Sequence, residues 1–135
     1  MRNITTKLLL ALIVLTGVLL VGCSDNPRRS HYNAIGLVTT NTQEKGSISF
    51  HQFKGRYVLK LRCSNDGQLL SYNASLKTGN VKVYCDIDGM DRELLFELND
   101  GDEATSFYTG TKRGAIYIII ESSDKSFDGR LEFNL

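Results

Sequence analysis

The stretch CDIDGMD, which runs from Cys85 to Asp91, carries three aspartates two and three residues apart around one glycine. Carboxylate oxygens are the ligands that Ca²⁺ takes in protein loops. An EF-hand loop, however, needs oxygen ligands at positions 1, 3 and 5, glycine at position 6 and glutamate at position 12. Counted from Asp86, position 5 is Met90 and position 6 is Asp91, so the stretch does not match this kind of calcium site.

A tight turn accounts for the same residues. Asp88-Gly89 is typical of a two-residue hairpin loop, because glycine takes positive φ without steric cost. We therefore predict a turn flanked by exposed Asp86 and Asp91, and we expect no cofactor. A looser calcium site remains the alternative, made by Asp86, Asp88 and Asp91 with the acidic residues of 100–103 if folding brings both turns together.

Residues of catalytic type are not arranged for nucleophilic chemistry, which needs a nucleophile, a base and an orienting group held together. His31 precedes the predicted domain, and His51 lies next to Phe50 in a predicted strand, so we expect His51 to point to solvent. Cys63 and Cys85 alternate with polar residues and should face the core, which favours a structural role over a reactive one. No Gly-x-Ser-x-Gly motif occurs. The sequence thus predicts a protein that is not an enzyme.

Three tyrosines in predicted strands are candidates for a contact surface. Tyr117 alternates with apolar isoleucines, and Tyr84 and Tyr57 lie in other strands of the same pattern. Exposed apolar patches mark contact surfaces, and tyrosine combines an apolar ring with a polar hydroxyl that suits protein or sugar ligands. The alternative is that the second sheet or the N-terminal tether covers these rings.

The sequence pattern predicts that these residues lie on or between β-strands. Short runs with period-2 alternation are the mark of half-buried strands, and no stretch has the 3.6-residue period of a long amphipathic helix. We predict strands at residues 35–40, 47–53, 56–63, 69–76, 81–87, 93–98, 104–108, 115–120 and 131–135. Asp-Gly pairs are expected to turn the chain at residues 66–67, 88–89, 100–101 and 128–129.

About eight or nine short strands with turns every 8–12 residues are typical of a two-sheet sandwich. We therefore predict an all-β fold, a single antiparallel β-sandwich of jelly-roll or immunoglobulin-like type, over residues 34–135. Sixteen Lys and Arg residues against 15 Asp and Glu residues give a formal net charge of +1. Because nucleic-acid binding needs a basic stripe, this balance argues against a nucleic-acid partner.

The N-terminal segment has the features of a secretory signal peptide. Arg2 and Lys7 are followed by an apolar run over residues 8–21 that ends in small residues before Cys23. A basic segment, an apolar core and small residues before a cut define such a peptide, so we assign it to residues 1–22. The ending LVGC resembles the lipobox of bacterial lipoproteins, and the resemblance implies a diacylglycerol and a further acyl chain, such as palmitate, on Cys23.

An anchor of several acyl chains would hold the protein stably on a membrane. Residues 23–33 would then be a flexible, lipid-anchored tether ahead of the domain at 34–135. The expected location is the outer membrane of a bacterium with two membranes, or the outer face of the cell membrane in a bacterium with one.

Cys63 and Cys85 form an even pair in a domain that is predicted to be exported, where disulfides persist. We therefore expect a disulfide between them. The alternative is two separate buried thiols, since free cysteine packs well in protein cores.

The later part of the domain resembles a known family of small secreted sandwiches. KTGNVKVYCDIDGMDRELLFEL, beginning at Lys77, and RGAIYIIIESSDKSFDGRLEFNL, ending at Leu135, are similar in layout to pre-peptidase C-terminal domains. The resemblance covers residues 46–135 and implies a β-sandwich. Asn80 and Lys82 stand where that family has aspartates before its tyrosine strand, so a calcium role does not carry over.

Binding is the class of function that these features favour. We expect a membrane-anchored lipoprotein of the cell envelope, whose non-catalytic sandwich binds a protein or glycan partner through a tyrosine-bearing face. The alternative is an inhibitor or immunity lipoprotein that blocks a foreign hydrolase or a phage factor.

Overall fold

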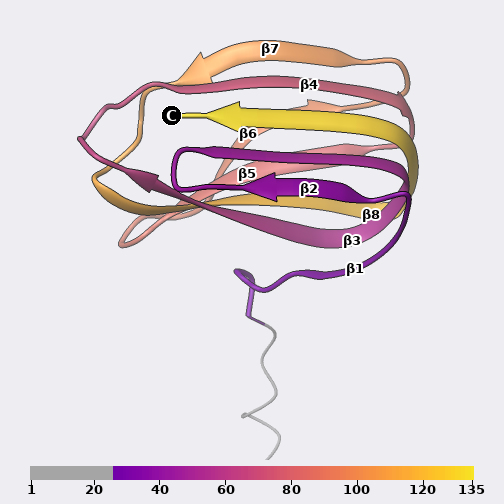
Figure 1. Cartoon of the computed structure of the whole chain (residues 1–135), viewed down its shortest axis with the longest axis horizontal. Coiled ribbons are helices and arrows are strands. Elements are labelled where there is room, and N and C mark those ends of the chain that lie inside the picture. The colour runs from indigo at the N-terminus through magenta and orange to yellow at the C-terminus, as the bar shows by residue number, and fades with distance from the viewer. Residues whose placement is uncertain (1–25) are drawn as a thin grey trace, which may run out of the picture.

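The computed structural model describes residues 26–135, so the predicted signal peptide and Cys23 lie outside the described residues. All of the regular secondary structure assigned in this range is β-strand, and the strands form two layers (Figure 1). They are β1 (His31–Ile35), β2 (Val38–Asn41), β3 (Lys45–Cys63), β4 (Leu70–Thr78), β5 (Val81–Ile87), β6 (Glu93–Leu98), β7 (Glu103–Tyr108) and β8 (Gly114–Asn134). No helix that could cross a bilayer lies between residues 26 and 135.

Two long strands, β3 and β8, contribute to both layers. They pair antiparallel from end to end, with one break in register just before Gly55. Residues 45–53 of β3 and 126–134 of β8 form the first layer together with β2, β4 and β7. Residues 55–63 of β3 and 114–122 of β8 form the second layer together with β5 and β6. Strand β1 pairs with β3 at the bend between the layers.

Gly55 permits this bend. Its φ is +114°, a conformation that residues with a side chain rarely adopt. A Cβ atom at this position would also overlap the carbonyl oxygen of His31 in β1. The corner of the sandwich therefore requires glycine for two independent reasons.

The strand order makes the sandwich a jelly roll. The first layer has the order β2-β3-β8-β4-β7, and the second has β3-β8-β5-β6. Strands β4 and β5 follow one another in the chain but lie in opposite layers, as do β6 and β7, which is the double Greek-key arrangement of jelly rolls. The predicted all-β sandwich is thus confirmed. The predicted strands 47–53 and 56–63 are one strand, as are 115–120 and 131–135, because a bend rather than a turn carries the chain between layers.

The core lies between the layers and is built from the inward-facing half of each strand's alternation. Ile48 and Leu131 of the first layer belong to the same buried cluster as Leu59 of the second. Phe96 of β6 stacks on Phe133 of β8 with ring centroids 6.2 Å apart. The two outward faces are therefore left to contact solvent, ligands or other surfaces.

The predicted turn at Asp88-Gly89 is present, but as part of a connection over residues 88–92 and not as a two-residue hairpin loop, and Asp86 beside it is buried rather than exposed. This connection joins the paired strands β5 and β6, and the amide of Met90 donates to the carbonyl of Ile87 at 3.1 Å. Gly89 has φ +75°, as the second central residue of such a turn requires.

The predicted turn at Asp128-Gly129 is wrong, because both residues lie inside β8. Gly129 pairs with Phe50 across the sheet, and a Cβ atom on Gly129 would overlap the Phe50 ring. Asp128 has φ +51°, and its carboxylate bonds His51 at 2.8 Å. The Asp128-Gly129 dipeptide therefore does not reverse the chain, and the glycine is explained by the Phe50 ring that packs over it.

The predicted boundary between tether and domain also differs from the structure. Strand β1 begins at His31, inside the stretch assigned to the tether. Before it, Ser30 accepts a hydrogen bond from the amide of Val58 at 2.9 Å, and Arg28 binds two carboxylates of β5 and its following turn. The folded part thus includes residues that sequence composition alone places in a linker.

Candidate functional site

The outward face of the first layer carries a row of polar side chains that crosses five strands. The strand register sets Thr40 of β2 opposite Ser47 of β3, and Ser47 opposite Glu132 of β8. Glu132 lies opposite Asn73 of β4, which lies opposite Thr105 of β7. Directly paired residues of an antiparallel sheet point to the same side, so these five side chains form one continuous row.

Two flanking rows extend this face along the strands. On one side Lys45, Asn134, Ser71 and Phe107 are consecutive partners across β3, β8, β4 and β7. On the other side, the row contains Val38, Ser49, Arg130, Ser75 and Glu103. Most members are hydroxyl or amide residues, and we call the three rows together the polar face.

The polar face is hollowed. A groove of about 760 Å³ runs over the central row and the row that contains Lys45 and Phe107. Two further hollows of about 550 and 320 Å³ continue it over the row of Arg130. All three hollows include Glu132 in their walls, so this residue marks the centre of a single concave surface.

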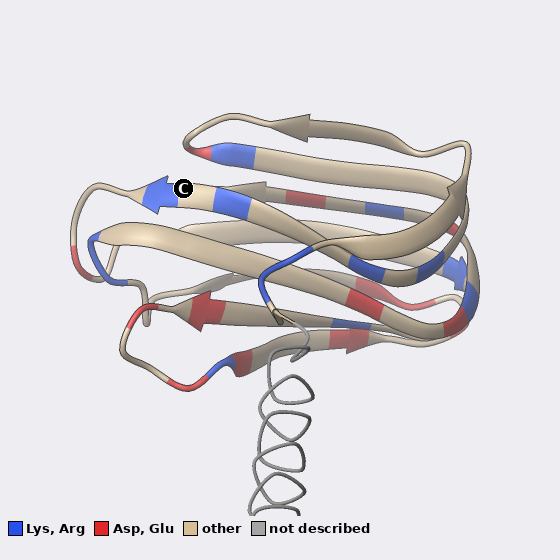
Figure 2. Ribbon diagram, turned by 90° about the horizontal axis from the view of Figure 1, so that it is seen from below, with Lys and Arg blue, Asp and Glu red and all other residues tan. Residues whose placement is uncertain are grey.

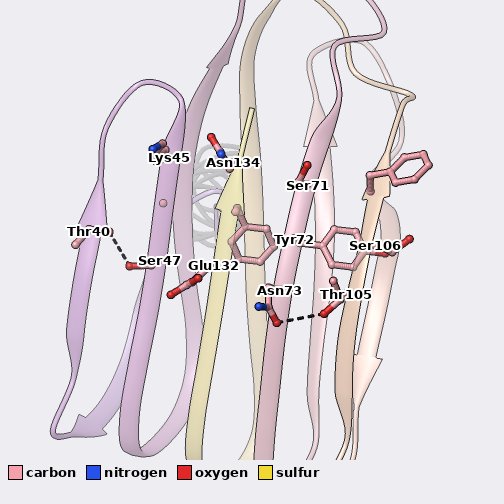
Figure 3. A pocket seen from close by; sticks show the side chains of 13 residues that line it. Thr40, Lys45, Ser47, Ser71, Tyr72, Asn73, Thr105, Ser106, Glu132 and Asn134 are labelled. Carbon is pink, nitrogen blue, oxygen red and sulfur yellow. Dashed lines mark hydrogen bonds between the residues drawn. The ribbon is translucent and has the colours of Figure 1, made fainter.

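Hydrogen bonds hold several groups of the polar face in place (Figure 3). The hydroxyls of Thr40 and Ser47 are 2.6 Å apart on one side of Glu132. On the other side the hydroxyl of Thr105 donates to the amide oxygen of Asn73 at 3.3 Å. Arg130 donates to one oxygen of Glu132, at 3.0 Å from Nε and 2.7 Å from its terminal nitrogen. The polar face therefore offers both hydrogen-bond donors and acceptors on paired strands.

The charge on the polar face is balanced. Lys45 and Arg130 carry positive charge, and Glu103 and Glu132 carry negative charge. Figure 2 shows the same mixture of signs over the strands of both layers. At one edge the ring of Phe107 is 61% exposed. Such a surface suits a ligand with many uncharged polar groups and some apolar area.

The outward face of the second layer carries two of the three predicted contact tyrosines. The guanidinium of Arg92 lies 3.9 Å from the ring centroid of Tyr84, and that of Arg28 lies 4.4 Å from the centroid of Tyr117. Ile119, on the same face, is completely buried. Arg92 therefore covers the ring of Tyr84 and the N-terminal Arg28 covers that of Tyr117, so the predicted alternative of cover by the tether holds for Tyr117 only.

Tyr57 does not belong to this surface. It points inward, packs against the core, and makes an edge contact with Tyr32 at 5.5 Å between ring centroids. The predicted contact surface of Tyr57, Tyr84 and Tyr117 is therefore wrong, because strand alternation sends Tyr57 to the opposite side from the other two.

The three aspartates of CDIDGMD do not gather around a common point. Nε of Arg28 lies 3.0 Å from Asp86 and one terminal nitrogen lies 2.6 Å from Asp88, while Asp91 takes no part in this contact. Between residues 26 and 135, no three Asp, Glu, His or Cys side chains are placed to hold a metal ion. The looser calcium site is thus not assembled, and an arginine occupies the carboxylates that it would use.

A second cluster on the outward face of the second layer is centred on Glu121. Arg56 and Arg92 bind its carboxylate at 3.1 and 3.0 Å. Partial burial alone would raise the pKa of Glu121, but the hydrogen bonds from Arg92 and Arg56 outweigh that effect and lower its pKa. Glu121 is therefore a structural anion and not a general acid.

Cys63 and Cys85 are both buried free thiols, so the predicted disulfide is wrong and the alternative holds. Strands β3 and β5 pair with opposite sides of β8. The spacing between strands therefore by itself places the two cysteines about 9.5 Å apart. A disulfide requires Cα atoms within about 7 Å. Burial, reinforced by Glu93 and Asp86, raises the pKa of Cys85 to about 12, so this thiol stays protonated and unreactive.

His51 is exposed, as predicted, and its Nδ1 bonds Asp128 at 2.8 Å. Among the hydrogen bonds of residues 26–135, none joins His51 to a hydroxyl or a thiol. The pair therefore lacks the nucleophile that an acyl-transfer site requires.

Comparison with known proteins adds little to this geometry. No family model and no curated protein matches the chain. Among solved structures, a mutant of the carbohydrate-binding module CBM29-2 complexed with mannohexaose is 13% identical, with a TM-score of 0.42 over 78% of this chain and 89% of that one. A CBM4 structure is 13% identical with a TM-score of 0.37, covering 82% of this chain and 86% of that one. The Drosophila melanogaster CENP-C cupin domain is 14% identical with a TM-score of 0.34, covering 83% and 84%. Similarity at this level carries no argument about function.

Proposed function

We propose that the protein is not an enzyme and that its polar face binds a neutral glycan. The observation that supports this most is the single concave surface centred on Glu132 and walled by hydroxyl and amide side chains. Its main groove, about 760 Å³, falls within the range of about 300–1,000 Å³ typical of small-ligand sites.

The chemistry of the wall matches a polyhydroxylated ligand. A sugar hydroxyl donates one hydrogen bond and accepts others, and Ser, Thr and Asn side chains do the same. Because these side chains are short and stand on paired strands, little conformational entropy is lost when they bind. The exposed ring of Phe107 adds an apolar contact for one face of a sugar ring.

The charge balance favours a neutral chain over an anionic one. Arg130 is paired with Glu132, and Lys45 is the other positive side chain in the three rows. A polyanionic glycan would need an excess of basic groups, which this face lacks.

The N-terminal LVGC motif supports attachment of this binding domain to a membrane through a lipid on Cys23. The protein would then be exported and would lie on the outer membrane, or on the outer face of the cell membrane in a cell with one membrane. Its role would be to hold an envelope glycan close to that membrane.

Calorimetric titration with neutral and with anionic oligosaccharides tests the proposal. We expect binding of a neutral oligosaccharide, weakened about tenfold or more by Asn73→Ala or Phe107→Ala, since each removes one contact from the groove and tenfold corresponds to about 1.4 kcal/mol. Asn33→Ala and Leu94→Ala, which truncate an exposed amide and an exposed large apolar side chain outside the polar face, are the controls and should leave affinity unchanged.

Failure of every neutral glycan to bind the folded protein would contradict the proposal. If the same face instead captured a foreign hydrolase or a phage protein, and lost it on Asn73→Ala, the inhibitor or immunity function would replace it.

A further inference from the structure

The N-terminal segment is fixed to one particular face of the sandwich. Arg28 binds Asp86 and Asp88 and stacks on the ring of Tyr117, all on the outward face of the second layer. Ser30 is bonded to Val58 of the same layer. The polar face lies on the opposite side of the molecule, because it belongs to the first layer (Figure 2).

The sequence sets how far this face can lie from the lipid. Arg28 follows Cys23 by five residues. A chain spans at most about 3.6 Å per residue, so Cys23 lies within roughly 18 Å of the point where Arg28 is docked. The sheets of a sandwich are themselves about 10 Å apart, and side chains add to both faces. A lipid on Cys23 therefore brings the second layer to the membrane before the first.

The chemistry of the same face suits a lipid surface. Lys60, Arg62 and Lys82 alternate with inward-facing residues and are exposed on it. Leu94 is 48% exposed beside Tyr84. Basic side chains attract anionic headgroups, and apolar side chains among them enter the interface. Asp91 and Glu97 carry the opposite charge nearby, so the short connection to the lipid contributes more to orientation than the charges do.

We propose that the outward face of the second layer rests on the membrane and that the polar face points away from it. This inference rests on the proposed lipid attachment at Cys23. In this orientation Arg28 acts as a positioning residue, since its three contacts determine which face the lipid draws to the bilayer. The groove is then open to ligands from the outside.

Fluorescence quenching in vesicles tests the orientation. The full chain, processed and lipidated in the cell, is reconstituted in vesicles of phosphatidylethanolamine and phosphatidylglycerol that contain headgroup nitroxide lipids. A reporter cysteine is introduced at an exposed strand position of either face, Lys60→Cys or Ser71→Cys, and labelled with the same fluorophore. The buried Cys63 and Cys85 are expected not to react.

We expect the label at position 60 to be quenched several-fold more than the label at position 71. Equal quenching, or stronger quenching at position 71, on a chain whose mass confirms the lipid would overturn the orientation and leave the anchor standing. A chain that carries no lipid would overturn both.

Arg28→Ala separates positioning from attachment. It keeps Cys23 and the lipid but removes the contacts to Asp86, Asp88 and Tyr117, so the difference in quenching between the two labels should shrink. If the difference in quenching between the two labels is as large in the Arg28→Ala chain as in the unsubstituted chain, the positioning role of Arg28 is overturned. A cooperative melting transition like that of the unsubstituted chain, followed by far-ultraviolet circular dichroism, confirms that the variant is folded.

Discussion

Among single residues, arginines pair with the carboxylates and cover the tyrosine rings on the outward face of the second layer. Arg28 converts two aspartates that resemble part of a calcium loop into ion-pair partners. Arg92 covers Tyr84 and at the same time shares Glu121 with Arg56. The ion pairs are not visible in the composition of the segments that carry these arginines, because their carboxylate partners are 29–65 positions away in the chain.

Glu121→Gln should destabilise the protein, because two arginines lose their charged partner. The Glu121 side chain is 25% exposed, so we expect a loss of about 1–2 kcal/mol, at the lower end for bonds to charged groups. The lowered pKa of Glu121 means that its contribution is present above the pKa of the unfolded chain, near 4.5, and is lost as pH falls toward the folded-state pKa.

Denaturant unfolding between pH 7 and pH 3 measures both effects. Glu132→Gln is the matched control: its carboxylate is 46% exposed and its partner Arg130 is 73% exposed, so we expect about 0.5 kcal/mol or less. Equal losses in the two variants, or an unchanged pH dependence in Glu121→Gln, would contradict the assignment of Glu121 as the half-buried structural anion of this cluster.

At the scale of elements, the two long strands β3 and β8 replace four predicted ones. Each long strand passes from one layer to the other without a turn, β3 at Gly55 and β8 between Ser122 and Ser126. Ser122 and Ser126, both buried in β8, have hydroxyls 2.7 Å apart, and both hydroxyls lie within 3.2 Å of the carbonyl oxygen of Asn80, which accepts from this pair. These bonds satisfy buried polar groups at the corner where β8 crosses between layers, which a simple alternation pattern would place in a loop.

Gly129→Ala should destabilise the fold by about 1–3 kcal/mol, the usual cost of overpacking a core. Gly129 does not have positive φ, so the backbone accepts alanine, and the cost comes from overlap with the Phe50 ring. Thermal or denaturant unfolding measures the loss.

The double variant Phe50→Leu, Gly129→Ala is the control for this mechanism. If overlap with the ring is the cause, the double variant should be more stable than the sum of the two single losses predicts, by about 0.5 kcal/mol or more. Additive losses would mean that Gly129 is required for another reason.

At the scale of the whole molecule, the two outward faces have different chemistry. The first layer presents a concave surface of hydroxyl, amide and balanced charged groups, whereas the second layer presents arginine-covered tyrosines and the docked N-terminal segment. Because one face is held by the segment that leads to Cys23, the other is left free. Under the proposed function, ligand binding and membrane attachment would therefore lie on opposite sides of one core.

Calcium should leave the stability of the whole molecule unchanged. Arg28 already neutralises Asp86 and Asp88, so Ca²⁺ would have to displace a guanidinium. A ligand that binds only the folded state at 100 times its Kd stabilises by about 2.7 kcal/mol. Coincident melting curves in excess calcium and in chelator are expected, and a clear rise in melting temperature with calcium would mean that the acidic turn is a metal site after all.

The class of fold and the periodic pattern of its strands follow from the order of the residues alone. Alternation in segments such as 56–63 places Leu59, Leu61 and Cys63 inside, because neighbouring side chains of a strand point to opposite faces. The turn at Asp88-Gly89 also followed from local chemistry, since glycine alone takes its conformation freely.

The pairing of strands that are distant in the chain depends on tertiary packing, and the polar face depends on that pairing. The outward direction of Ser47, Asn73 and Glu132 was readable from alternation, but their assembly required the register of β3, β8 and β4. The separation of Cys63 from Cys85 and the contact of Arg28 with Asp86 depended on it equally. Local sequence carries the direction of each side chain, whereas pairing between distant strands is set by how the whole core packs.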